Sequence, residues 1–145
     1  MKSQKSVATI LEREVGPTIK EWLRRVNLLP ALTRILLSNE DRTFHLPDLF
    51  RDLVCRLRPA EEAHLPDSGA AIAHGQRRQR QGYSPDMLAE ESRVFQVVTF
   101  QTLHFHKDKL DQERVLLDVV VIADEVDLQL SQAVRCWITP HASAG

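Results

Sequence analysis

The chain has 145 residues, of which 43% are hydrophobic and 27% are charged, and its formal net charge is −1 at pH 7. These values are typical of one soluble globular domain with a sizeable core. A charge so close to zero argues against a protein that grips nucleic acid or an anionic membrane electrostatically. No apolar run approaches the roughly 20 residues that span a bilayer, and the N-terminal MKSQKS lacks the apolar core of a signal peptide. We therefore expect a cytoplasmic protein that binds neither nucleic acid nor membrane.

Residues 6–27 predict the first helix, because apolar residues recur there at spacings of three and four. The stripe consists of Val7, Leu11, Val15, Ile19, Trp22 and Val26. Gly16-Pro17 interrupts this pattern, so we expect a kink or a break at that point. Trp22 lies on the stripe, which favours a place in the core over a role in stacking on a ligand.

Residues 28–58 predict a series of shorter segments. Pro30 ends the first helix, and 31–37 predict one or two helical turns. Ser38 is expected to cap the next helix, because Asp41 follows three residues later as in a capping box. Pro47 marks a further helix. Its apolar face consists of Leu46, Leu49, Phe50, Leu53, Val54 and Leu57.

The segment 59–69 (PAEEAHLPDSG) predicts a loop, because Pro, Gly, Asp and Ser cluster there. A basic helix is predicted over 70–81, with Arg77, Arg78 and Arg80 close together. These arginines could hold a phosphate or an acidic partner, but a solvated face with one inward salt bridge is the simpler interpretation.

A long helix is predicted to follow the break at Gly82-Tyr83. Ser84 is a good N-cap, since its hydroxyl can accept from a free backbone N–H of the first turn, and Pro85 suits the first helical position. The helix then runs for about 20 residues. One face contains Leu88, Glu91, Phe95, Val98, Thr102 and Phe105.

Glu91 is the unusual member of that face, because a carboxylate inside an apolar stripe is costly unless it is paired. The candidate partners are His74, Arg77 and Arg78, on the helix that must fold back across the break. We favour a structural ion pair that fixes how the two helices cross. The alternative is a switch in which a small anion competes with Glu91 for Arg78, and it predicts that Glu91→Gln changes output while the fold survives.

Residues 113–138 predict the last helix, with an apolar spacing of three and four over more than six turns. The run 119–123 (VVVIA) is apolar all round, so this helix has more apolar surface than one core needs. We therefore expect dimerisation through it, with Val120, Val121 and Leu128 as candidate interface residues.

The patterns together predict an all-α fold, a single-domain bundle of about five to six helices with a long C-terminal helix. Residues 1–138 form this domain, and 139–145 (TPHASAG) form a disordered tail or a linker. No hairpin spacing, internal repeat or extended heptad pattern argues for another architecture.

Several of these residues resemble the signature of the RsbRD-type N-terminal domain, the RsbT co-antagonist family. The resemblance rests on His74, Arg78, Gln81-Gly82-Tyr83-Ser84, Leu88 and Glu91. Trp22, the segment 37–49 and the long last helix match in order and spacing, so nearly the whole chain is covered. Ser92 departs from the family, which commonly has an aromatic residue after the glutamate. The resemblance implies a regulatory input module of a bacterial stressosome protein or a cytoplasmic sensor histidine kinase of a two-component system.

No motif indicates catalysis, and we expect neither a cofactor nor a metal ion. His104 and His106 are the one pair with a metal-like spacing, but residues two apart on a helix point roughly 200° from each other. Cys55 and Cys136 stand in no zinc-binding spacing and are expected to be buried free thiols. A haem ligated by His74 or His104 is conceivable, but no haem-specific signature accompanies either residue.

The sequence therefore predicts a non-enzymatic sensory or regulatory domain, active as a homodimer and joined to an output domain such as a kinase. His74, Arg78 and Glu91 form its candidate polar network. Trp22, Tyr83, Phe95 and Val98 are candidates for lining a pocket for an unknown small-molecule ligand. A ligand-free adaptor or scaffold is the main alternative, and a helical protein that binds haem or metal is the third.

Overall fold

The computed structural model describes residues 4–58 and 69–138, and these ranges fold into helices without a β-strand. The predicted all-α bundle is confirmed. The helices are α1 (Val7–Arg13), α2 (Val15–Val26), α3 (Pro30–Thr33), α4 (Asn39–Thr43), α5 (Leu46–Leu57), α6 (Ala70–Arg80), α7 (Pro85–Phe105), the 3-10 turn η1 (Lys107–Lys109), α8 (Val115–Ala133) and α9 (Arg135–Ile138). None of the described helices combines the length and the apolarity that crossing a bilayer requires.

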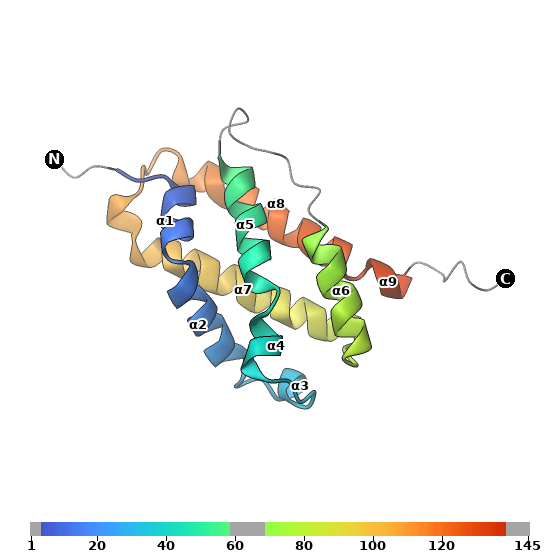
Figure 1. The fold of residues 1–145 in the computed structure, drawn as a ribbon. Coiled ribbons are helices and arrows are strands. Elements are labelled where there is room, and N and C mark those ends of the chain that lie inside the picture. Colours follow the sequence, from blue (N-terminus) through green and yellow to red (C-terminus); the bar gives the residue numbers. More distant parts are fainter. Residues whose placement is uncertain (1–3, 59–68, 139–145) are drawn as a thin grey trace.

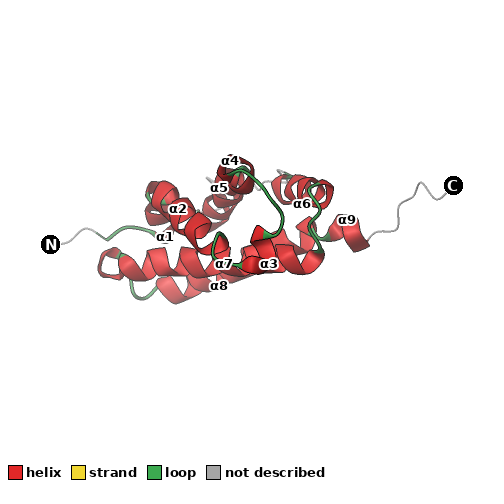
Figure 2. Ribbon diagram, turned by 90° about the horizontal axis from the view of Figure 1, so that it is seen from below, coloured by secondary structure: helices red, strands yellow, loops and turns green. Residues whose placement is uncertain are grey.

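The helices form two layers (Figures 1 and 2). The long helices α7 and α8 pack side by side in one layer, and α1, α2, α5 and α6 cross over them in the other. α6 packs mainly on α8, α2 mainly on α7, and α5 contacts both α1 and α8. The core between the layers contains large side chains with at most 3% exposure, including Trp22, Phe50, Phe95 and Ile122.

Helix starts follow the local sequence signals closely. The Ser6 hydroxyl accepts from the Thr9 N–H at 3.1 Å, and the Ser38 hydroxyl accepts from the Asp41 N–H at 3.0 Å, as expected of N-caps. Ser84 precedes α7 as predicted, but its hydroxyl donates to the Asp86 carboxylate instead of accepting from the backbone. The predicted cap bond at Ser84 is therefore absent.

The first helical segment breaks at Glu14, slightly before the expected position at Gly16-Pro17. Pro17 explains the shift, because a proline has no N–H to donate to the carbonyl four residues earlier, on Arg13. The chain therefore ends α1 at Arg13, and Pro17 lies in the first turn of α2, where the missing N–H has no cost.

Three further expectations need correction. The last helix does not run unbroken to residue 138, because α8 ends at Ala133 and the short α9 follows. Phe105, expected on the inward face of α7, is 84% exposed, since it ends the helix beside an open surface pocket. Cys55 and Cys136 are free thiols but only half-buried. The predicted loop, apart from its last residue, and the predicted tail lie outside the described residues.

Two glycines are required by the way α6 packs and ends. A Cβ on Gly75 would lie 1.8 Å from the Ala133 carbonyl oxygen, so only glycine lets α6 approach the end of α8 this closely. Gly82 has a φ of 97° and follows α6 in a Schellman ending. Its N–H bonds the Gln79 carbonyl at 3.1 Å, and the Tyr83 N–H bonds the Arg78 carbonyl at 2.9 Å. This ending turns Tyr83 back under α6.

Candidate functional site

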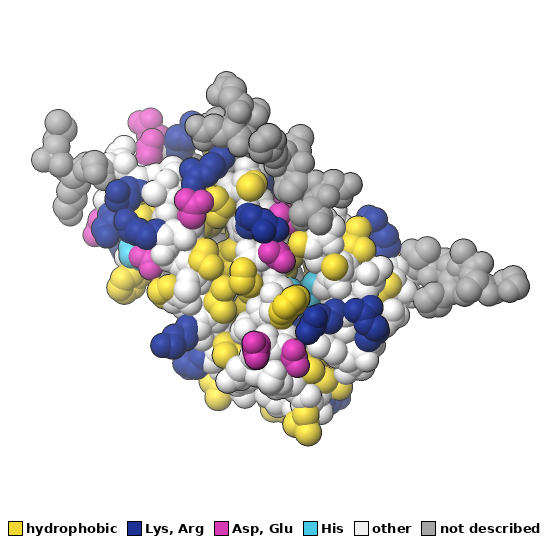
Figure 3. All heavy atoms as spheres, in the orientation of Figure 1, with side chains coloured by type: hydrophobic (Ala, Val, Ile, Leu, Met, Phe, Trp, Pro, Cys, Tyr) yellow, Lys and Arg dark blue, Asp and Glu magenta, His cyan; other side chains and the backbone are white. Residues whose placement is uncertain are grey.

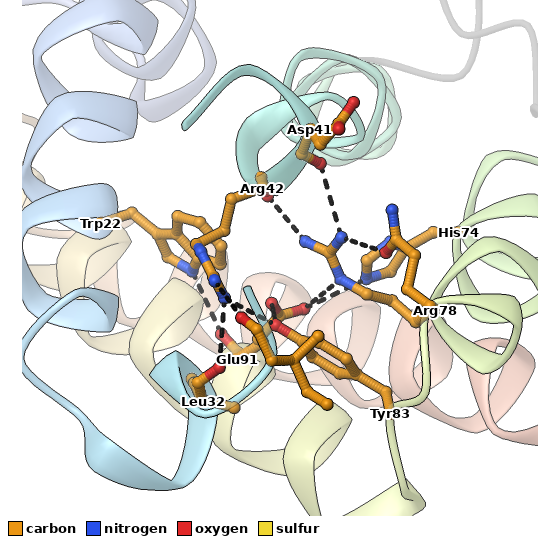
Figure 4. A network of polar contacts seen from close by, with 10 residues as sticks. Trp22, Leu32, Asp41, Arg42, His74, Arg78, Tyr83 and Glu91 are labelled. Atoms are coloured by element: carbon orange, nitrogen blue, oxygen red, sulfur yellow. Dashed lines mark hydrogen bonds and ion pairs between the residues drawn. The ribbon is translucent and has the colours of Figure 1, made fainter. Parts of the chain in front are cut away.

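Glu91 of α7 lies at the centre of a buried polar network, with 3% of its surface exposed (Figure 4). Its Oε1 accepts from the Nε of Arg78 at 3.1 Å, and its Oε2 accepts from the Tyr83 hydroxyl at 2.7 Å. The Nε2 of His74 lies 3.5 Å from Oε1. His74 and Arg78 therefore do meet Glu91, as expected, whereas Arg77, the third candidate partner, pairs with Asp41.

Arg78 links α6 to the segment around α4. It has no exposed surface, and each of its nitrogens has a partner. Beyond Glu91, its Nη2 donates to the Arg42 carbonyl at 2.7 Å, and its Nη1 donates to Gln81 Oε1 at 2.7 Å and to the Asp41 carbonyl at 3.4 Å. A solute cannot reach this guanidinium unless α4, α6 and α7 separate.

Two further residues complete the network. Arg42, at 3% exposure, donates to the Tyr83 hydroxyl at 3.0 Å and to the Ile35 carbonyl at 2.7 Å. The indole Nε1 of Trp22 donates to the Glu91 backbone carbonyl at 3.2 Å. Trp22 was expected in the core, whereas the burial of Arg42 was not foreseen.

The network fixes the charge state of its acidic members. Burial acts to raise the pKa of Glu91, but the nearby imidazole of His74 and the charge of Arg78 outweigh it, and the pKa lies below its usual value. Burial and the neighbouring Glu91 carboxylate raise the pKa of Tyr83. Glu91 is therefore a carboxylate at neutral pH, and Tyr83 is a neutral phenol that donates to it.

Beside this network, two histidines stack on each other. The rings of His45 and His74 have centroids 3.5 Å apart and an interplanar angle of 10°, and each residue is 7% exposed. Burial lowers the pKa of His45 well below its usual value, and the positive charge of Arg78, together with that of His74 when it is protonated, adds to this effect. Burial also lowers the pKa of His74, more than the nearby Glu91 carboxylate raises it. Both rings are therefore neutral at pH 7, and His45 is a site residue that the sequence did not single out.

A small cavity of about 30 Å³ adjoins the two histidines. Such a volume holds about two water molecules. Its wall includes His45, His74, Glu91, Ser92, Gln129 and, of the predicted pocket residues, Trp22 and Phe95. Val98 and Tyr83 do not line it, because Val98 borders a separate surface pocket with Thr18 and Phe105, and Tyr83 belongs to the polar network.

A larger surface pocket of about 180 Å³ borders the other side of the same two histidines, with Arg77, Arg80 and Asp48 in its wall. Arg77 lies over the Phe44 ring at 4.3 Å and donates to Asp41 at 3.2 Å. Figure 3 shows basic side chains gathered on this face over the second half of α6.

The candidate interface residues lie on the outer side of α8. Val120 is 61% exposed and Leu128 is 45% exposed, whereas Val121 is half-buried. Leu116 and Leu117, at 71% and 66% exposure, extend the exposed apolar surface. His104 is exposed, and His106 lies 3.3 Å from the Glu14 carboxylate, so the two residues face different surroundings.

Comparisons with known proteins give the chain no relatives. No family model matches it, and neither a curated protein nor a solved structure shows significant similarity. The resemblance to the RsbRD-type domain therefore remains a hypothesis, carried by the residues around His74 to Glu91.

Proposed function

We propose that this chain is a regulatory input domain, without enzymatic activity of its own, that passes a signal through shifts of α8 at a dimer interface to an output domain. The observation that carries the proposal is the division of α8 into two apolar sides. Ile122 and Val126 face the core, at 0% and 2% exposure. Leu116, Leu117, Val120 and Leu128 lie on the opposite side and are exposed.

The exposed apolar residues form a strip. At 100° per residue, Leu116, Leu117, Val120 and Leu128 fall within about one third of the helix circumference. The exposed Asp124 interrupts this strip between Val120 and Leu128. Grouped apolar side chains of this kind are typical of protein interaction surfaces. The other side of α8 contacts α5, α6 and α7. A shift of α8 at the interface would therefore also displace these three helices.

The polar network holds α2, α6 and α7 together while α8 shifts. Glu91 binds side chains from α6 and from the segment after it, while its carbonyl holds α2 through Trp22. We favour a structural role for this network over the anion switch, because Arg78 is inaccessible to solvent.

A ligand-free adaptor or scaffold is the second candidate, and the small volume of the cavity beside the two histidines favours it. Space for about two waters excludes most organic ligands from the cavity in this conformation. In that case the strip on α8 would assemble a complex without transmitting an internal signal.

The oligomeric state of the purified chain tests the proposed interface. We expect a dimer by light scattering, and a monomer with unchanged helical circular dichroism for Leu117→Glu combined with Val120→Glu. Leu36→Glu is the matched control, because Leu36 is 92% exposed and lies far from α8 in the chain. A wild-type monomer at all concentrations, or equal disruption by Leu36→Glu, would contradict the interface.

Transmission is tested in a protein that carries the output domain. We expect the paired α8 substitutions to change output activity, and Leu36→Glu to leave it unchanged. Loss of the dimer with unchanged output would favour the scaffold.

A further inference from the structure

We infer that His45, His74 and Glu91 form a binding site for one divalent transition-metal ion of the zinc class. In the described part of the chain, these three residues each offer a ligand atom, and all three atoms lie within 4.8 Å of one another. All three are buried, at 3% to 7% exposure. The inference does not depend on the proposed regulatory function.

The donor set matches the chemistry of zinc. Two imidazoles and one carboxylate, with a fourth position left for water, form a recurrent zinc-binding set. The imidazoles must be neutral to coordinate, and burial keeps both in that form at pH 7. The Glu91 carboxylate supplies the negative charge that a divalent ion requires.

The spacing of His74 and Glu91 fits a shared ion better than a direct hydrogen bond. Their Nε2 and Oε1 atoms are 3.5 Å apart, beyond the normal N–H···O range. Two donors that each lie about 2.1 Å from a tetrahedral ion are roughly 3.4 Å apart. The stacked His45 ring must turn away from His74 to direct its own lone pair at the ion, and the adjacent cavity gives it room.

Glu91 retains capacity for an ion despite its two hydrogen bonds. A carboxylate has about four lone-pair positions, and Arg78 and Tyr83 occupy two of them. Carboxylates that bind metals are commonly oriented by such hydrogen bonds. The positive charge of Arg78 weakens the site, so we expect exchangeable binding instead of permanent retention.

One buried polar atom in the cavity wall also has room for a bound group. Within the described residues, Gln129 Oε1 has no hydrogen-bond partner. Gln129 is an acceptor in the wall of the same cavity, which suits a water that donates to it while bound to the ion. The surface pocket that also borders His45 and His74 offers a route for the ion, with Asp48 but also Arg77 and Arg80 in its wall.

The test uses the chain without an affinity tag, stripped with chelator and then dialysed against ZnCl₂ or CoCl₂. We expect about one ion per chain by elemental analysis, a rise in Tm, and intense visible bands for Co²⁺ that indicate low coordination. X-ray absorption of the zinc-loaded chain should show two imidazole ligands. No stoichiometric zinc or cobalt, or a zinc shell without imidazoles, would overturn the inference.

Two variants locate the ion. His45→Phe keeps an aromatic ring against His74 and Trp22 but removes the ligand atom, so it should weaken binding at least about tenfold. His104→Ala, which removes an exposed histidine, should bind as the wild type does. Wild-type affinity in a folded His45→Phe chain would overturn the site. If His45→Phe does not fold, the ligand count from X-ray absorption still decides.

Discussion

The Nε of Arg78 lies 3.1 Å from Oε1 of Glu91, and these side chains are 0% and 3% exposed, although they come from different helices. An ion pair this deeply buried adds little net stability when it is complete, because both charges lose their hydration. Breaking it is costly, since one charge is then left buried without its partner. The pair therefore fixes the way α6 crosses α7.

Glu91→Gln tests that role. We expect the free energy of unfolding, measured with urea, to fall by about 3 to 5 kcal/mol, because Arg78 would keep its charge and lose its carboxylate. Glu90→Gln is the matched control, since Glu90 forms a surface ion pair with Arg93 at 2.8 Å. The control should change stability by less than about 1 kcal/mol. Similar effects of the two substitutions would show that the buried pair has no special role.

Tyr83→Phe probes the hydroxyl at the other oxygen of Glu91. The substitution keeps the ring but removes a donor to Glu91 at 2.7 Å and an acceptor for Arg42 at 3.0 Å. We expect a loss of about 1 to 3 kcal/mol, because both groups would be left partly unsatisfied in the core. The combined variant with Glu91→Gln should lose less than the sum of the single changes, since both act on one network. Strict additivity in urea unfolding would contradict this coupling.

Gly75→Ala is expected to destabilise the chain strongly. A Cβ there would lie 1.8 Å from the Ala133 carbonyl oxygen and 2.7 Å from its Cα, so α6 would have to move away from α8. The loss should reach about 1 to 3 kcal/mol, the range for overpacked cores. Gly16→Ala is the control, because nothing lies within 4 Å of a Cβ at that helical position. We expect Gly16→Ala to leave the Tm unchanged or higher, and equal Tm values for the two variants would argue against the close approach.

The sequence was sufficient to predict the helical fold and the meeting of His74, Arg78 and Glu91. The meeting of these residues could be predicted because a carboxylate in an apolar stripe requires a partner. The break at Gly82 also directs the preceding helix back across the helix that contains Glu91. The position of Tyr83 follows from the helix ending at Gly82, which only the backbone geometry reveals.

His45 and Arg42 could not be found in the same way. His45 precedes His74 by 29 positions, and no spacing rule connects them. Arg42 lies in the polar segment NEDRT, which resembles a solvated turn. It can be buried because the Leu32 and Ile35 carbonyls accept hydrogen bonds from its guanidinium. Every residue has a main-chain carbonyl, so a hydropathy pattern does not show which carbonyls will serve as acceptors.

The stacked histidines predict a loss of stability in mild acid for the metal-free chain. Burial holds the pKa values of His45 and His74 below the value of about 6.5 for an unfolded histidine. Below that pH the unfolded chain binds protons that the folded chain excludes, so stability is present above about pH 6.5 and falls as the pH drops. Each imidazole contributes a slope of at most about 1.4 kcal/mol per pH unit.

The measurement is urea unfolding between pH 8 and pH 5 in buffer with chelator. Glu91, whose pKa is lowered, keeps its charge in the folded chain over this range and should not account for the loss. His45→Phe removes one of the two groups, so its stability should fall less steeply with acid than that of the wild type. His104→Ala should follow the wild-type curve, because the His104 side chain is exposed. A wild-type chain that is equally stable at pH 5 and pH 8 would mean that the histidines take up protons without opening the fold.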